Sequence, residues 1–213
     1  MLGVFVSVPV ACFRKGLARE YLETEQLPPP ATCYGFLLSL IGETNRRRHI
    51  GCRIAPVLLN RPPLSVVLRT VWRIKKLPLG SGGNTRPDYQ QLLTNVELLI
   101  WLDSTEEQPN GAKLEERVQL ALTRPTAISR FGGLCIGEST HLVDQVWLWE
   151  RVQSRYVHEQ GRAFLLHERG QLTLPVWVDH VGSAGTRYAT GRLEKIPLNA
   201  PPARERLPRI DPQ

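Results

Sequence analysis

Side chains that could act as general acids or bases are scattered along the chain rather than gathered in a motif. Activating a hydroxyl needs a base to take its proton and a cation to meet the developing charge, a task suited to histidine or tyrosine with lysine. No lysine stands next to a histidine in this sequence. The lysines are Lys15, Lys75, Lys76, Lys113 and Lys195, and the histidines are His49, His141, His158, His167 and His180. We interpret the histidines as structural or exposed and predict no catalytic residue.

Motifs for covalent, nucleotide or metal chemistry are also missing. The sequence has no Gly-x-Ser-x-Gly, no P-loop and no paired carboxylates at metal-ligand spacing. The cysteines show no Cys-x-x-Cys spacing and stand among apolar neighbours, as buried thiols do in a reducing cytoplasm. They are Cys12, Cys33, Cys52 and Cys135. We expect no disulfide, no metal and no cofactor.

The cations favour phosphate binding over catalysis. The chain has 27 Lys and Arg against 20 Asp and Glu, and a pI near 9.6. Arginine supplies 22 of the cations, and its planar guanidinium matches phosphate geometry. A basic pI alone does not distinguish a nucleic-acid-binding protein from other basic proteins.

The distribution of charge is more informative than its total. Ten cations and no carboxylate lie between Glu43 and Asp88, including the triplet Arg46, Arg47 and Arg48. Residues 97–116 are acidic instead. We infer that the basic part follows a phosphate backbone and that the acidic part could meet a basic protein. The alternative for the triplet alone is a solvated loop.

Three further groups of residues suit phosphate contacts. The glycines in Arg130-Phe131-Gly132-Gly133 could form a cradle of phosphate size, or an ordinary turn. Thr32 at a helix start offers an anion site. The third group follows the first strand and could equally be surface charge: Arg14, Lys15 and Arg19.

The elements that must position these residues are mostly strands. Hydrophobic patterning predicts strands over 2–10, 49–59, 64–74 and 96–103, then 145–152, 163–167, 172–178 and 187–196. Helices are predicted over 31–42, with Thr32 as N-cap, and over 112–122. The apolar N-terminus resembles a buried strand rather than a signal peptide, and no membrane span is expected. We expect a frayed tail from Pro197 onward.

Five ordered stretches resemble the Cas5 family, a RAMP-type subunit of the CRISPR Cascade complex. The first is Pro29-Pro30-Ala31-Thr32-Cys33-Tyr34-Gly35 with the helix that follows it. The others cover 49–55, 86–93, 131–139 and 174–180. The likeness spans nearly the whole chain and is greatest to Myxococcus-type and I-B-like members.

The resemblance implies an α+β fold with a ferredoxin-like, RRM-like sheet in residues 1–125. A glycine-rich loop and a C-terminal β-rich part would fill 126–196, and 197–213 would be a flexible tail. The family's β-hairpin thumb would correspond to residues 77–92, although a surface loop is the alternative. The thumb residues would be Leu79, Gly80, Gly82, Gly83, Asn84 and Arg86.

The resemblance also implies a cytoplasmic subunit that caps the five-prime handle of crRNA. Its partners would be a Cas7-type backbone subunit and a Cas8-type large subunit, with target DNA reached through the complex and no membrane. The RNA-binding residues would be Arg14, Lys15, Arg19, Thr32, Tyr34, Arg46, Arg47, Arg48, Arg130, Phe131, Gly132 and Gly133. Tyr34 would be a packed or base-stacking aromatic.

Catalysis separates two hypotheses within this resemblance. In the I-C branch the subunit itself cleaves precursor crRNA without metal, using a tyrosine and an adjacent Lys-His pair. This sequence has Tyr34 but no such pair, so we expect a non-catalytic subunit. A metal-independent RAMP endoribonuclease is the alternative, and a generic RNA-binding domain outside CRISPR is a third.

Overall fold

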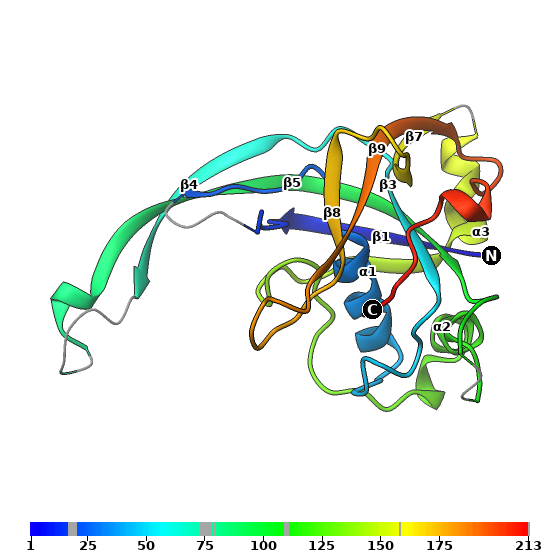
Figure 1. Cartoon of the computed structure of the whole chain (residues 1–213), viewed down its shortest axis with the longest axis horizontal. Coiled ribbons are helices and arrows are strands. Elements are labelled where there is room, and N and C mark those ends of the chain that lie inside the picture. The colour runs from blue at the N-terminus through cyan, green and yellow to red at the C-terminus, as the bar shows by residue number, and fades with distance from the viewer. Residues whose placement is uncertain (17–20, 73–77, 79, 109–110, 158, 213) are drawn as a thin grey trace.

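Within the residues that the structure describes, the strands form a nine-stranded sheet. The computed structural model describes residues 1–16, 21–72, 78, 80–108, 111–157 and 159–212. Seven strands follow the order β6-β1-β5-β3-β7-β9-β8, while β2 and β4 pair with β5 outside this path (Figure 1). Adjacent strands are antiparallel except for β2 and β5. The strands are β1 (Leu2–Ala11), β2 (Tyr21–Leu22), β3 (Arg53–Leu58), β4 (Leu64–Trp72), β5 (Thr85–Asp103), β6 (Gln145–Leu148), β7 (Gln160–Leu166), β8 (Leu172–Trp177) and β9 (Arg187–Pro197).

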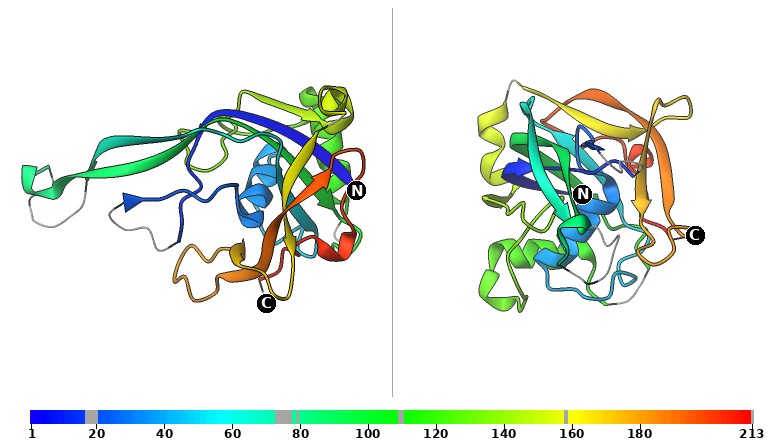
Figure 2. Two further views of the ribbon diagram at one scale, coloured as in Figure 1. Left: turned by 90° about the horizontal axis from the view of Figure 1, so that it is seen from above. Right: turned by 90° about the vertical axis from the view of Figure 1, so that its left-hand side faces the viewer.

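Both faces of the sheet are covered, so its central strands are apolar on both sides. Helices α1 (Pro30–Leu40) and α2 (Leu114–Thr123) pack on one face, and the short α3 (Trp149–Val152) packs on the other. Along β1 the side chains alternate between two cores: Val4 and Val6 belong to the α1 core, whereas Phe5 belongs to the α3 core. The strong curvature of the sheet around α1 is visible in Figure 2.

Helix α1 begins one residue before the predicted range, and its N-cap lies three residues before the predicted one. Pro30 occupies the first helical position and Pro29 is the N-cap, so the prediction that Thr32 caps this helix is wrong. Proline suits the first position because its missing N–H would have no helical partner there. The Thr32 N–H donates to Pro29 O at 2.9 Å. At the other end Gly42 has φ +67°, and a Cβ there would lie 2.1 Å from Ser129 O, so only glycine fits.

A long antiparallel hairpin projects from the body of the protein (Figures 1 and 2). It pairs β4 with the first half of β5, from Leu64 opposite Leu93 to Trp72 opposite Thr85. Residues 77–92 are predicted to be a thumb loop, and the next strand is predicted to begin at residue 96. In the structure, residues 85–92 already belong to strand β5. Pro87 and the polar residues around it concealed this strand. Proline is tolerated there because, among the described strands, Pro87 pairs only with Thr70 of β4, whereas the pairing with β2 begins farther along, at Tyr89.

The C-terminal part departs from the prediction in two places. The strand predicted over 145–152 ends at Leu148 and continues as α3. The frayed tail predicted from Pro197 is wrong up to Pro212, because this segment packs along β3. Leu207 and Ile210 are fully buried, and the Ile210 N–H donates to Cys52 O at 2.8 Å. The pairing of β6 with β1 and of β7 with β3 makes the sheet continuous across residue 125.

The cysteines are free thiols, three buried and Cys135 half-buried. Burial raises the pKa of Cys33 and of Cys52, so both stay protonated and unreactive. No helix in the described part of the chain is long and apolar enough to cross a membrane.

Candidate nucleic-acid interface

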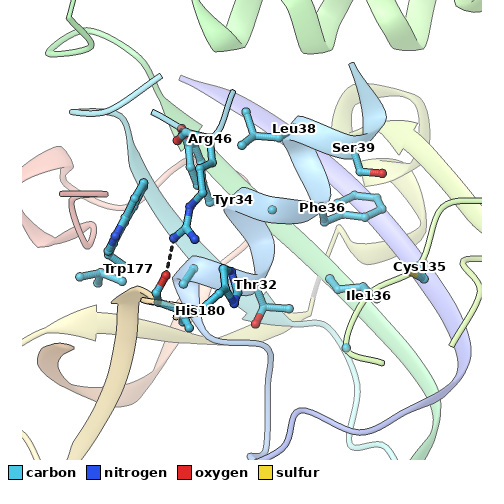
Figure 3. A pocket seen from close by; sticks show the side chains of 15 residues that line it. Thr32, Tyr34, Phe36, Leu38, Ser39, Arg46, Cys135, Ile136, Trp177 and His180 are labelled. Atoms are coloured by element: carbon cyan, nitrogen blue, oxygen red, sulfur yellow. Dashed lines mark hydrogen bonds between the residues drawn. The ribbon is translucent and has the colours of Figure 1, made fainter. Parts of the chain in front are cut away.

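A pocket of about 370 Å³ lies between α1, the end of β8 and the segment around Ile136. Figure 3 shows that its side chains come from both sides of this gap. The lining residues with polar or aromatic groups are Thr32, Tyr34, Phe36, Ser39, Arg46, Cys135, Trp177 and His180. Two residues of the RNA-binding prediction from α1 therefore meet Arg46 from the basic span in one pocket.

Arg46 is held inside this pocket by aromatic and backbone contacts. Its guanidinium carbon lies 4.0 Å from the centre of the Trp177 ring, and Nη2 donates to Val178 O. The Tyr34 hydroxyl donates to Arg46 O at 2.8 Å, and the Tyr34 and Trp177 rings lie 6.5 Å apart. Tyr34 is only 4% exposed, so the structure gives it the packed role and not base stacking. Burial raises its pKa well above the ordinary value.

The arginine triplet diverges. Arg48 turns back to Glu43, with 3.3 Å between Nη1 and Oε2. The Arg47 side chain is exposed, and its guanidinium has no hydrogen bond or ion pair with the residues that the structure describes. The three side chains thus have three roles: Arg46 lines the pocket, Arg48 anchors the loop and Arg47 faces solvent.

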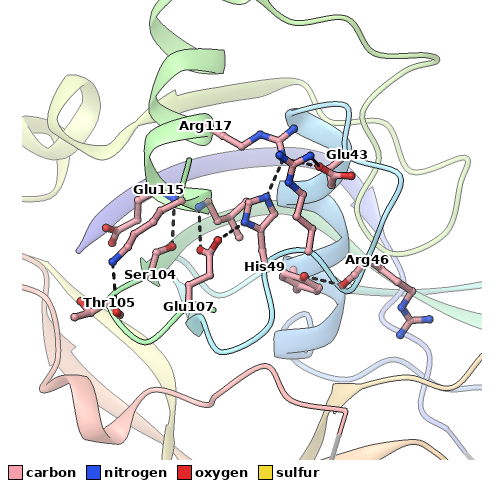
Figure 4. Close-up of polar contacts among 12 residues, drawn as sticks. Glu43, Arg46, His49, Ser104, Thr105, Glu107, Glu115 and Arg117 are labelled. Carbon is pink, nitrogen blue, oxygen red and sulfur yellow. Dashed lines mark hydrogen bonds and ion pairs between the residues drawn. The ribbon is translucent and has the colours of Figure 1, made fainter. Parts of the chain in front are cut away.

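A buried polar network fixes the loop that carries these arginines (Figure 4). His49 is fully buried, with Nδ1 bonded to Glu107 and Nε2 2.8 Å from Arg117 Nη1. Arg117 also pairs with Glu43 Oε2 at 2.5 Å. Because Arg117 can only donate, His49 Nε2 accepts and Nδ1 carries the proton toward Glu107.

Glu107 also serves as the cap of α2. Lys113 at the N-cap makes no capping bond with its side chain, and the Leu114 N–H instead donates to Glu107 Oε2 at 2.9 Å. Although burial would raise the pKa of Glu107, hydrogen bonds from His49 and Leu114 hold it below its ordinary value. Sequence reasoning missed this network, since its members are widely separated and form no motif. It also assigned no role to Trp177 and His180, although both lie in a stretch that carried the family resemblance.

The glycine-rich segment presents an aromatic ring to solvent. Phe131 is completely exposed, and Arg130 beside it donates from Nη1 to Gly132 O at 2.9 Å. Gly132 has φ +78° and Gly133 is exposed. Farther on, Ile136 and Gly137 line the pocket. The segment therefore joins an exposed arginine–aromatic pair to the pocket on α1.

The cations that follow β1 lie outside this pocket. Arg14 is exposed and its backbone bridges to Thr24, while Lys15 pairs with Glu23 at 3.7 Å. Arg19 lies outside the described residues. The structure therefore does not bring these predicted contacts into the pocket with Thr32 and Arg46.

The hairpin has two different faces. On one, Arg69 donates to Gln90, whose Nε2 donates to Glu138 at 2.8 Å. The other exposes large apolar side chains: Leu64, Val66, Leu68, Trp72 and Tyr89. Of the predicted thumb residues, Leu79 lies outside the described residues, Gly80, Gly82 and Gly83 are exposed, Asn84 is buried, and Arg86 pairs with Asp88 at 3.1 Å.

Metal binding has no obvious centre here. Within the described ranges, no three His, Cys, Asp or Glu side chains are grouped so that they could hold a metal ion.

Comparison with known proteins identifies a close relative and similar folds among solved structures. No family model matches the chain. The chain is 52% identical over 212 residues to the CRISPR-associated protein Cas5 of Myxococcus xanthus (strain DK1622), covering 99% of this chain and 97% of the relative. A chain of a CRISPR RNA-guided surveillance complex superposes with a TM-score of 0.59 at 13% identity, covering 91% of this chain and 89% of that one. A Cas protein crystal structure gives 0.56 at 15%, covering 100% and 99%.

Proposed function

The chain belongs to the CRISPR-associated Cas5 family, and we propose that it is the non-catalytic Cascade subunit that caps the five-prime handle of crRNA. In this role it bridges a Cas7-type backbone subunit and a Cas8-type large subunit in a cytoplasmic complex that targets DNA through the guide. The fold similarity to a chain of a surveillance complex supports the proposal.

The observation that carries RNA binding is the exposed Phe131 beside Arg130. Burying a phenylalanine side chain is worth about 1.5–3 kcal/mol, so a fully exposed ring on a glycine-rich turn has no folding purpose. An aromatic platform flanked by a guanidinium is the combination that binds a single-stranded base and its phosphate. We assign Phe131 to base stacking and Arg130 to the adjoining phosphate.

The pocket on α1 supplies a second contact of different character. Arg46 is pre-positioned by Trp177 and Val178, so little side-chain freedom is lost when an anion binds near it. His180 and Thr32 add polar groups at the same pocket. The pocket could hold one nucleotide of a strand that continues onto the surface.

In this proposal the hairpin is the thumb of the family, and the strands that support it form a ferredoxin-like core. If the short β2 and the hairpin strand β4 are set aside, the first four strands in chain order are β1, β3, β5 and β6. Helix α1 lies between β1 and β3, and α2 lies between β5 and β6. Their spatial order, β6-β1-β5-β3, is the order of a ferredoxin-like sheet. The exposed apolar face of the hairpin suits a protein partner, which supports insertion beside a Cas7-type subunit.

The environment of three candidate bases supports a non-catalytic role. Tyr34 is buried with a raised pKa, which disfavours the phenolate that a base would need. His49 is fully buried in the network with Glu107. His141 is 8% exposed, and its Nδ1 accepts the Cys12 N–H at 3.2 Å. None of these three side chains is free to meet a ribose hydroxyl.

The proposal is tested in the assembled complex. The chain is co-expressed with its Cas7-type and Cas8-type partners and a CRISPR array, and nuclease protection of the crRNA handle is measured. Phe131→Ala should weaken the stacking contact by about 1–3 kcal/mol and expose the handle. Val157→Ala, at an exposed valine beyond α3, is the control. A handle equally protected in Phe131→Ala and the wild type would contradict the assignment.

A further inference from the structure

A second hollow, in which every charged lining residue is a cation, lies away from the interface described above. It has a volume of about 240 Å³ and forms where β3 ends, β7 begins and β9 ends. Its lining contains three cations, Arg61, Arg162 and Lys195, and no carboxylate. The other lining residues are Leu58, Leu59, Asn60 and Gln160. None of these residues belongs to the RNA-binding set inferred from the sequence.

The register of the sheet places two of these cations directly opposite each other. Arg162 on β7 pairs with Lys195 on β9, so both side chains leave the same face. On the neighbouring strand β3, Leu58 is the register partner of Arg162, so the Leu58 side chain lies on the same face of the sheet. Like charges at directly opposed positions destabilise a sheet. An unoccupied hollow therefore carries an electrostatic cost that a bound anion would remove.

No carboxylate of the described residues neutralises this pair. Glu194 precedes Lys195 but lies on the opposite face, where it pairs with Arg192 at 2.7 Å and with Arg206. Glu97 accepts a hydrogen bond from the Tyr156 hydroxyl at 3.1 Å, in the α3 core. Arg162 makes a single long hydrogen bond to Gln26, at 3.5 Å.

The backbone under the hollow is rigidly packed. A Cβ on Gly161 would lie 2.4 Å from Val57 Cγ1 and 2.8 Å from Leu198 Cδ2, so a larger residue would force these buried side chains to shift. Asn60 is fixed at the rim, where its Nδ2 donates to Asn95 O at 2.6 Å and its Oδ1 accepts the Glu97 N–H at 3.3 Å. A site held this firmly loses little entropy when it binds a ligand.

We propose that this hollow binds a phosphodiester group of an RNA strand, with Arg162 and Lys195 as its ligands and Arg61 closing the rim. A guanidinium and an ammonium that line one hollow suit the charge and the acceptor oxygens of a phosphate. Arg61 immediately precedes the segment that enters β4, so the hollow lies at the root of the projecting hairpin. A strand held along the hairpin would pass it. The inference rests on the proposed RNA-binding function and adds a contact to it.

The test is the salt dependence of RNA binding by the full-length chain. A fluorescein-labelled single-stranded RNA of repeat sequence is titrated with wild type and with Arg162→Gln/Lys195→Gln over a series of KCl concentrations. Each lost phosphate contact on a single strand lowers the slope of log K against log salt by about 0.7. Because Arg162 and Lys195 together hold one phosphate, the double variant should lose about 0.7 from the slope and bind about 5-fold more weakly near 0.1 M salt.

Arg155→Gln/Arg169→Gln removes the same charge from two exposed arginines elsewhere and should keep the wild-type slope. Arg61→Gln, at an exposed loop position, should lower the slope by less than the double variant does and leave the folded sheet unaffected. A wild-type slope in Arg162→Gln/Lys195→Gln, or equal losses in both double variants, overturns this site while RNA binding stands. Failure of the wild type to bind RNA overturns the proposed function and this site with it.

Discussion

Replacing Glu107 by alanine should lower the free energy of unfolding by about 3–5 kcal/mol, as expected when one partner of a buried polar pair is removed. The Glu107 side chain is 3% exposed and the His49 side chain is fully buried. The carboxylate accepts from the His49 ring and from the Leu114 N–H, the first amide of α2. Its removal leaves two buried donors without an acceptor, and each unpaired donor costs about 1–3 kcal/mol.

Glu107→Gln should cost less than the alanine variant, because its single amide oxygen can still satisfy one of the two donors. The pH dependence of the free energy of unfolding distinguishes the contribution of the Glu107 charge from that of the side chain's shape. The pKa of Glu107 is held below its ordinary value of 4.5, so its stabilisation is fully present above that pH. It is lost as pH falls through the lower pKa of the folded state. The stability gap between wild type and Glu107→Gln should therefore narrow on acidification.

The assay is urea unfolding followed by tryptophan fluorescence, with Glu116→Ala as the control. Glu116 is an exposed acidic residue in the first turn of the same helix, and its replacement should change stability by less than about 0.5 kcal/mol. In a double-mutant cycle, removal of His49 together with Glu107 should cost less than the sum of the single effects. A Glu107→Ala variant as stable as Glu116→Ala would refute the argument for a buried network.

Three further predictions address the surface. Arg47→Gln should lower the salt slope of RNA binding by about 0.7, measured by fluorescence anisotropy, because Arg47 is the triplet member that faces solvent; an unchanged slope would remove it from the interface. Lys195→Glu should raise the free energy of unfolding by about 0.2–1 kcal/mol in a thermal melt, since it turns a repulsive pair with Arg162 into an attractive one; a loss of stability would contradict this. Leu68→Lys should leave the isolated chain within about 0.5 kcal/mol of wild type but impair co-elution with a Cas7-type subunit in size-exclusion chromatography; normal assembly would count against the thumb.

Regular elements were predictable where the pattern of residues is local. The strands β1, β8 and β9 have β-branched and aromatic residues in short runs, and both long helices have an apolar face. The first half of β5 was not predictable, because its stability comes from pairing with β4 and its polar sequence resembles a loop. The structure of the C-terminal tail was not predictable for the same reason. It depends on backbone hydrogen bonds to Cys52 and Ile54, which are distant in the sequence.

The candidate site was only partly predictable. Charge spacing pointed to the basic span, and the glycine-rich segment marked Phe131. The distinct roles of the three arginines depend on contacts with Trp177, Val178 and Glu43, which come from tertiary packing. The opposed pair in the second hollow depends on strand register, which composition does not specify.

In the proposed function this member of the Cas5 family binds guide RNA without cleaving it. The most direct measurement incubates the purified chain with end-labelled repeat RNA in EDTA and analyses the mixture on native and denaturing gels. The account predicts a shifted complex on the native gel and full-length RNA on the denaturing gel. Cleavage at a specific position would contradict it and support a metal-independent endoribonuclease instead.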